Sequence, residues 1–269
     1  MSMTNLNMVA FTWTPNASGT PPSVVDLARL KTISIAPQNT QVNAKGIAAR
    51  HSLMLNVKQE QTVDFTVMLK KAAGEPLMTN LDITLWDIGT STHYLGSLRS
   101  GSIDCTTLTD EGSGIASGYK NPVAVGSNYE ITTEKLIVAD STWASALING
   151  VVTDWDVVAS ITFGGVAFSA PMTIKSAKHT VDRDKVQMEE VTLTPKGAPT
   201  GPSDNSLLGN ILLGTSQVSL AIDTGAGQYN TASAQWALIT KLTTRFADAN
   251  VIEQTGQFVF QGPAAYVAD

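Results

Sequence analysis

Residues 62–70 read Thr-Val-Asp-Phe-Thr-Val-Met-Leu-Lys, and this alternation decides the fold class. An extended strand would place four apolar side chains on one face: Val63, Phe65, Val67 and Leu69. A period of two is the pattern of a strand that turns one face to a core and the other to water. The stretch 155–163 repeats it, with Trp155, Val157, Ala159, Ile161 and Phe163 on one face.

Weaker alternation recurs along the whole chain, at residues 9–13, 32–36, 53–57, 82–86, 129–138 and 217–222. Turn-forming residues separate the runs, at 37–40, 73–76, 112–114 and 223–225. Many short strands joined by polar turns are typical of an antiparallel arrangement and not of a βαβ fold. The sequence therefore predicts an all-β protein, an antiparallel β-sandwich or barrel with one or two short flanking α-helices.

Three segments are candidates for these helices. Ser141 and Thr142 would cap a helix that runs to Asn149, and Ser206 would cap one over Leu207–Leu213. Gly150 and Gly214 follow the two segments and would end the helices, although Gly209 inside the second segment makes that helix less favourable. Residues 24–30, after the Pro21-Pro22 break, are a weaker third candidate.

The composition excludes several classes of protein. Among 269 residues, 43% are hydrophobic and 15% are charged, which excludes an intrinsically disordered chain and argues against a coiled coil. The net charge of −6 argues against a protein that grips a nucleic-acid backbone. Cys105 is the single cysteine, so no internal disulfide can form. We expect no signal peptide and no membrane span, because the apolar runs are far too short.

The chain is expected to have three parts: an N-terminal arm (1–30), a β-sandwich domain (31–200) and a C-terminal β unit (201–269) packed in the same sandwich. Residues 195–206, rich in Gly and Pro, form the boundary. The stretches 141–200 and 206–265 resemble each other. A shift of 65 residues aligns four pairs without a gap: Ile174 with Ile239, Val186 with Val251, Leu193 with Phe258, and Gly197 with Gly262. This pattern indicates either a true duplication or two β-hairpins that look alike because all hairpins share similar alternation and turn residues.

One motif suggests catalysis. Asp223-Thr224-Gly225 matches the signature of aspartic proteases, in which two such carboxylates share a proton across a two-fold axis. Too few residues follow it to complete a fold of the retroviral type. The same three residues are ideal for a hairpin turn between two strands. We therefore expect no enzyme, and the Asp223 protease remains a remote alternative.

Other chemistry-bearing residues lack the spacing of a site. The histidines His51, His93 and His179 are scattered, and Asp182-Arg183-Asp184 offers too few oxygens for calcium. Five tryptophans could form a sugar-binding face, as in an adhesin, although strand tryptophans more often anchor cores or interfaces: Trp13, Trp86, Trp143, Trp155 and Trp236. We expect no catalytic residue, metal or cofactor.

Three features resemble the tail tube proteins of long-tailed bacteriophages. They are His93-Tyr94-Leu95-Gly96-Ser97, the stretch 121–126, and the two repeat endings at Gly197 and Gly262. The closing pattern carries most weight: Leu238-Ile239-Thr240, a polar tip near Asp248, and a last strand through Phe258-Val259-Phe260. The resemblance covers about the C-terminal two-thirds of the chain.

The resemblance implies a β-sandwich whose copies close into rings, hexameric or trimeric, that stack into a hollow tube for DNA. It implies a virion protein made in the host cytoplasm, with partners such as the tape measure and terminator proteins. DNA would pass without specific binding, and no membrane is involved. The N-terminal arm and residues 178–190 would serve ring-to-ring contacts. A capsid, decoration or tail-terminator protein remains an alternative.

Overall fold

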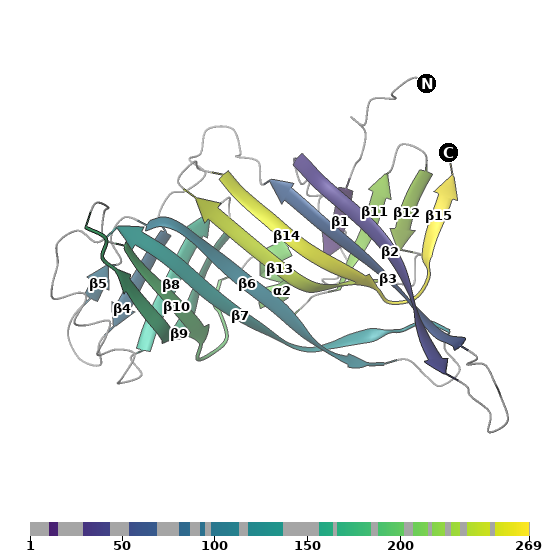
Figure 1. Ribbon diagram of the computed structural model, residues 1–269, viewed down its shortest axis with the longest axis horizontal. Helices are drawn as coiled ribbons and strands as arrows, with labels where there is room; N and C mark the ends of the chain where they lie inside the picture. Colours follow the sequence, from purple (N-terminus) through teal and green to yellow (C-terminus); the bar gives the residue numbers. More distant parts are fainter. Residues whose placement is uncertain are drawn as a thin grey trace, which may run out of the picture.

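A computed structural model describes most of the chain. The described residues are 11–15, 29–43, 54–68, 81–86, 92–94, 98–112, 118–136, 156–163, 166–183, 188–201, 207–214, 217–223, 227–231, 236–247 and 251–268. Within these ranges the chain forms fifteen strands and one short helix (Figure 1). Every strand-to-strand ladder is antiparallel, which confirms the predicted all-β fold with a flanking helix.

All fifteen strands belong to one continuous sheet, within which we distinguish a long layer from a shorter one that joins it where β11 pairs with β13. The long layer has the order β2 (Arg29–Asn43), β3 (Met54–Met68), β14 (Val251–Phe260), β13 (Ala237–Ala247), β6 (Leu98–Glu111), β7 (Pro122–Leu136), β10 (Met188–Pro195), β9 (Val166–Thr180), β8 (Asp156–Phe163), β4 (Leu81–Trp86) and β5 (Thr92–Tyr94). The shorter layer has the order β1 (Phe11–Pro15), β11 (Gln217–Asp223), β12 (Gly227–Thr231) and β15 (Ala264–Ala268). Figure 1 shows the shorter layer grouped at the end of the sheet that carries β2 and β3.

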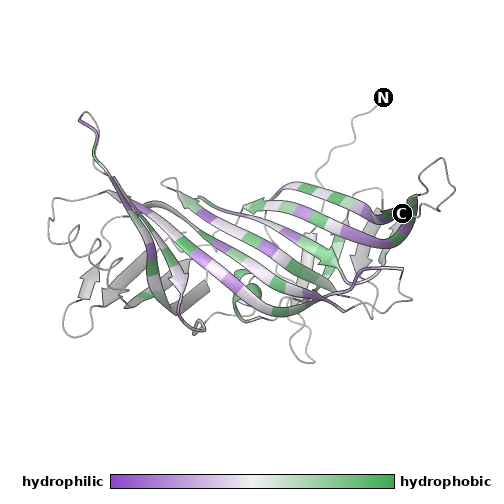
Figure 2. Cartoon of the chain, turned by 60° about the horizontal axis from the view of Figure 1, so that its bottom comes forward, coloured by the Kyte–Doolittle hydropathy of each residue, from purple (hydrophilic) through white to green (hydrophobic). Residues whose placement is uncertain are grey.

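Alternation along the strands builds the core. On β3, Val63, Phe65 and Val67 are buried while Asp64 between them is exposed, as the sequence pattern predicts. Figure 2 shows the same alternation of polar and apolar positions along neighbouring strands. Phe65 stacks on Phe258 of β14, with ring centroids 4.8 Å apart. These side chains pin the register, because a slip of one residue would turn them to solvent.

The helix α2 (Leu207–Leu212) lies against the inner face of the long layer. All of its residues are buried, and it contacts β13, β6 and β7. Gly214 follows it with a φ of 73°, which only glycine adopts easily, so the helix ends there as predicted. The predicted helix at 141–149 lies outside the described residues. No helix in the described part of the chain is long and apolar enough to span a bilayer.

Two local predictions near the N-terminus are wrong. Residues 37–40 form no turn but continue β2, where Pro37 lies opposite Gln61 and Thr40 opposite Lys58 of β3. Cross-strand pairing overrides turn-forming composition there, and β2 tolerates proline because it has β3 on one side only among the described strands. Arg29 and Leu30, placed at the end of a weak helix candidate, begin β2 instead. In the segment expected to be an arm, β1 pairs with β11.

Gly256 generates a prediction about this core. A Cβ at Gly256 would lie 2.6 Å from Cζ of Phe65 and 2.8 Å from the carbonyl oxygen of Lys241. Because a backbone atom cannot yield cheaply, we expect Gly256→Ala to lower the free energy of unfolding by about 1–3 kcal/mol. Gly118→Ala is the control, since no atom lies within 4 Å of its Cβ position. Urea denaturation measures both, and equal stabilities would contradict this packing.

Candidate assembly site

Two long hairpins extend beyond the strands that flank them. β14 pairs with β3 only from Thr62 onward, so residues 54–61 of β3 continue with β2 alone as a ladder partner. β10 pairs with β7 only from Ile131 onward, and residues 122–130 continue with β6. We call residues 39–43 with 54–61 arm A, and residues 107–111 with 122–130 arm B. Figure 1 shows both arms reaching the same lower corner of the molecule.

The arms concentrate the exposed apolar surface. Ten large apolar side chains are exposed among the described residues, and seven of them lie on the arms: Val42, Met54, Leu55, Val57, Leu108, Val123 and Val125. Val125 is the most exposed, at 66%. Single exposed apolar residues are ordinary, but a cluster on projecting elements marks an interaction surface.

The arms are fastened to each other where they cross. The backbone N–H of Gln59 donates to the Gly118 carbonyl (2.8 Å), and the backbone N–H of Lys120 donates to the backbone carbonyl of Gln59 (2.9 Å). Gln59 and Tyr119 thereby form a parallel β-bridge. Each such hydrogen bond contributes about 1 kcal/mol net. The bridge fixes the position of arm B along arm A.

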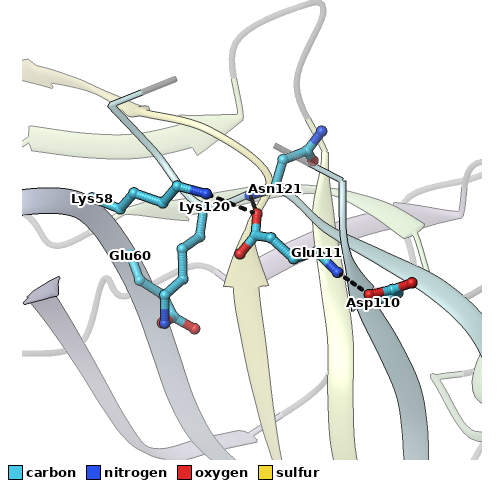
Figure 3. Close-up of polar contacts among 6 residues, drawn as sticks. All are labelled: Lys58, Glu60, Asp110, Glu111, Lys120 and Asn121. Carbon is cyan, nitrogen blue, oxygen red and sulfur yellow. Dashed lines mark hydrogen bonds and ion pairs between the residues drawn. The ribbon is translucent and has the colours of Figure 1, made fainter. Parts of the chain in front are cut away.

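Two ion pairs flank this bridge (Figure 3). Lys120 Nζ lies 2.6 Å from Glu60 Oε2, and Lys58 Nζ lies 3.7 Å from Glu111 Oε1. The Glu111 carboxylate also accepts a hydrogen bond from the backbone N–H of Asn121 at 3.1 Å, which orders the end of arm B. The side chains are partly exposed, so each pair contributes at most about 1 kcal/mol. We call the bridge and its two ion pairs the clasp.

The corner between β14 and β15 supports both arms. Gln261 Nε2 donates to the Pro122 carbonyl of arm B at 2.5 Å, and the Ala264 amide donates to Gln61 Oε1 at 2.9 Å, at the base of arm A. Gly262 turns the chain between these contacts with a φ of 119°, which side chains other than glycine rarely adopt. The arms are therefore anchored to the core as one unit.

The outer face of the long layer is polar and continuous. Thr32, Thr66, Thr255, Thr243, Asp104 and Glu130 stand opposite one another across six strands. Thr243 Oγ1 donates to Asp104 (2.6 Å), and Gln257 Nε2 donates to Asp64 (2.9 Å). Lys175 Nζ pairs with Glu130 at 2.5 Å. Hydrogen-bonded hydroxyl, amide and carboxylate groups cover much of this face, and the exposed Lys241 and Arg245 flank Thr243 on the same face.

The residues weighed for catalysis and metal binding lie apart from the arms. Asp223 ends β11 and lies opposite Gln228 of the antiparallel strand β12, so it stands at the end of a β-hairpin, as expected. His179 is exposed on β9, His93 lies on β5, and His51 is outside the described residues. Among the described residues, no group of three His, Cys, Asp or Glu side chains is placed to hold a metal ion.

The remaining candidates are also dispersed. Asp182 and Arg183 are exposed beyond the end of β9, while Asp184 lies outside the described residues. Trp236 is half-buried, and its carbonyl accepts a hydrogen bond from the Gln261 amide at 2.7 Å. Trp13 and Trp86 lie on β1 and β4, and Trp143 and Trp155 fall outside the described residues.

Two buried titratable groups belong to the core. Cys105 is 3% exposed, and burial, together with the nearby Asp104, raises the pKa of its thiol far above the usual range. Burial raises the pKa of Tyr129 to about 12, with a smaller effect from Cys105. The Tyr129 hydroxyl lies 3.4 Å from the Gly197 carbonyl. Both groups stay protonated at neutral pH and serve packing, because a thiol needs its anion to react.

Comparisons with known proteins concern the fold. No model of a known protein family matches the sequence. No curated protein is significantly similar to it in sequence. Among solved structures, a chain from the virion of a native gene transfer agent particle is similar, with a TM-score of 0.38 and 12% identity, over 47% of this chain and 100% of that chain.

Two further solved structures come from tails. One is a chain of the tail of an empty gene transfer agent particle with C6 symmetry (TM-score 0.36, 13% identity, 46% of this chain and 96% of that chain). The other is the SPP1 tail tube (TM-score 0.35, 10% identity, 51% of this chain and 85% of that chain).

The clasp leads to a prediction about the free subunit. Lys120→Gln removes its ion pair, so the Gln59 and Lys120 amides should exchange with solvent faster, while global stability changes by less than about 1 kcal/mol. The double variant Lys120→Glu with Glu60→Lys should restore part of the protection. Lys175→Gln, which breaks the Lys175–Glu130 pair on the outer face, is the control. Hydrogen exchange read by mass spectrometry measures the effect, and unchanged exchange in Lys120→Gln would contradict a role for the ion pair.

Proposed function

We propose that this chain is a structural virion protein that self-assembles into stacked rings, which form the tail tube of a long-tailed phage and conduct its DNA. The observation that carries the proposal is the pair of clasped arms with their exposed apolar side chains. The resemblance of the sequence to tail tube proteins supports the same reading.

The arms have the properties of a surface that is covered in an assembly. Apolar burial contributes about 25 cal/mol per Å², so leaving seven large apolar side chains in water forfeits several kcal/mol. The clasp and the β14–β15 corner hold the arms in place before any partner arrives, which reduces the entropy lost on docking. Rigid projecting arms suit an axial contact with the next ring of copies.

The polar outer face suits the lumen of such a tube. DNA passes most easily along a polar surface that repels phosphate and has no apolar patch. The exposed cations Lys241 and Arg245 also lie on this face. Asp64 and Asp104 are held flat on the sheet by Gln257 and Thr243, and Lys175 is occupied by Glu130. The net charge of −6 adds to the repulsion of phosphate. DNA would therefore pass through without specific binding.

The proposal extends to the surroundings of the protein. Rings contain six or three chains, and the ends of the tube meet other tail components such as the tape measure and terminator proteins. The chain is made in the host cytoplasm and functions in the virion without a cofactor, an enzymatic activity or a membrane. A capsid, decoration or terminator role would use the same fold without long tubes.

Electron microscopy of the purified protein tests this function. Concentrated protein should form hollow tubes of stacked rings, or rings with a central hole. Short caps or closed shells would favour the alternative virion roles. A protein that stays monomeric at high concentration would contradict the proposal.

A paired substitution tests the arms. Val57→Asp with Val125→Asp places a charge at the exposed apolar positions of both arms, so we expect tube formation to be lost. The folded monomer should keep its stability within about 0.5 kcal/mol, because both side chains are exposed. Leu213→Asp, at an exposed apolar position after α2, is the matched control and should assemble normally. Light scattering measures assembly. Normal assembly of the double variant would show that the arms do not contribute to tube formation.

A further inference from the structure

The two long hairpins are the same ladder at two places in the chain. From Leu30 onward, adding 68 to the residue numbers of the β2–β3 register reproduces the β6–β7 register. Both irregularities coincide: the shift between Thr40 and Gln41 recurs between Leu108 and Thr109, and the one after Leu30 recurs after Leu98. Bulges are specific local features, so their coincidence is stronger evidence of equivalence than hairpin shape.

The later hairpins are equivalent as well. Adding 65 to the β9–β10 register gives the β13–β14 register, so Leu193 opposite Ile174 becomes Phe258 opposite Ile239. The extra bulge residue is Lys175 in one hairpin and Thr240 in the other, which are also 65 apart. This shift is the one that the sequence repeat predicts.

Two further pairs of ladders are also equivalent. β1 pairs with β11 as β4 pairs with β8, and Val218 lies opposite Ala237 as Val157 lies opposite Met172. The chain thus contains two modules that share these ladders, while β12 and β15 occur in the first module only. Module A consists of β1–β3 and β11–β15, and module B consists of β4 and β6–β10. Module B is nested inside module A along the chain.

One ladder joins the modules within the chain. β13 of module A pairs with β11 at its first residues and then with β6 of module B, from Lys241 opposite Thr106 to Phe246 opposite Gly101. The equivalent of β13 is β9, which pairs with β8 up to Thr173. Beyond that point no described strand pairs with this edge of β9. The equivalent of β6 is β2, whose outer edge also lacks a partner among the described strands.

Burial shows that these two edges are incomplete. At the internal junction Ile103 and Leu242 are fully buried. Their equivalents at the open edges are Ile35 and Ala177, which pack against the core but are only partly buried. A strand that paired with these edges would bury the surface that Ile35 and Ala177 still expose.

Side-chain volumes at the two edges are complementary. At the internal junction the large Phe246 ring lies over Gly101, where an added Cβ would be 2.4 Å from the ring. The equivalent positions hold Val181 and Ile33. Val181 is smaller than its equivalent Phe246, and Ile33 is larger than its equivalent Gly101. The two pairs therefore fill a similar total volume. Val181 is 65% exposed in the single chain.

We propose that β9 of one copy pairs antiparallel with β2 of a second copy, in the register of the β13–β6 ladder. Lys178 then lies opposite Ala36, and Thr180 lies opposite Ser34. The inference rests on the proposed ring assembly and supplies its lateral contact. Pro37 removes at most one hydrogen bond from the new ladder. In a ring closed in this way, module A and module B of successive chains alternate around the circle.

Engineered cysteines test the register. Lys178→Cys with Ala36→Cys in one chain should give, on mild oxidation, a covalent ladder of multimers that ends at the closed ring, with loss of the monomer band on a non-reducing gel. Directly opposed strand residues lie close enough for a disulfide after small adjustments. The native Cys105 does not interfere, because it is buried and protonated.

Two further pairs complete the experiment. Thr243→Cys with Asp104→Cys is the positive control, since this equivalent pair lies inside one chain and should close without multimers. Lys178→Cys with Thr32→Cys is the register control, four residues out of step, and should stay monomeric on the gel. Tubes in the microscope without a Lys178–Ala36 crosslink would overturn this inference and leave the proposed function standing. A chain that forms neither tubes nor crosslinks would overturn both.

Discussion

The β13–β6 ladder is the constraint on which the rest of the molecule depends. Edge strands carry rows of backbone donors and acceptors that must find partners, and this ladder satisfies two such rows by joining module A to module B. It also brings the core residues Leu242 and Ile103 under one continuous sheet. Without it, each module would have an open edge on both sides.

The nesting of the modules makes this core depend on distant segments. β3 meets β14 across a long stretch of the chain, as in the contact between Thr66 and Thr255, which are 189 residues apart. The segment between β3 and β14 contains module B, so these two strands can pair only around it. Because closing long loops costs entropy before the contacts form, module B, whose hairpins are closer in sequence, is expected to fold first.

The sequence predicts the strands well because alternation reflects burial directly, as at Val63, Phe65 and Val67. The sequence reveals the repeat only for the later hairpins, β9–β10 and β13–β14. In the earlier half, Ile33 corresponds to Gly101 and Phe65 to Thr133, so the side chains differ while the backbone register persists. Such equivalence lies in hydrogen-bond geometry, which composition does not record.

The arms were hidden from the sequence for a different reason. Leu55 and Val57 alternate just as Val63 and Phe65 do, yet the first pair is exposed and the second is buried. What separates them is that β14 stops pairing at Thr62. Similarly, the Pro-Gln-Asn-Thr run at 37–40 looks like a turn, and only its partners on β3 show that it is a strand.

The two kinds of incomplete surface differ in what they demand of a partner. A strand edge is satisfied only by another strand in one register, because each donor must meet an acceptor along the ladder. The apolar arms make no such demand, since apolar burial is non-directional. A ring closed by edges and stacked through arms would therefore have a fixed lateral geometry and a more adjustable axial one. In the proposed tube, edge pairing would therefore set the diameter of each ring, while the arms would set only how firmly successive rings hold together.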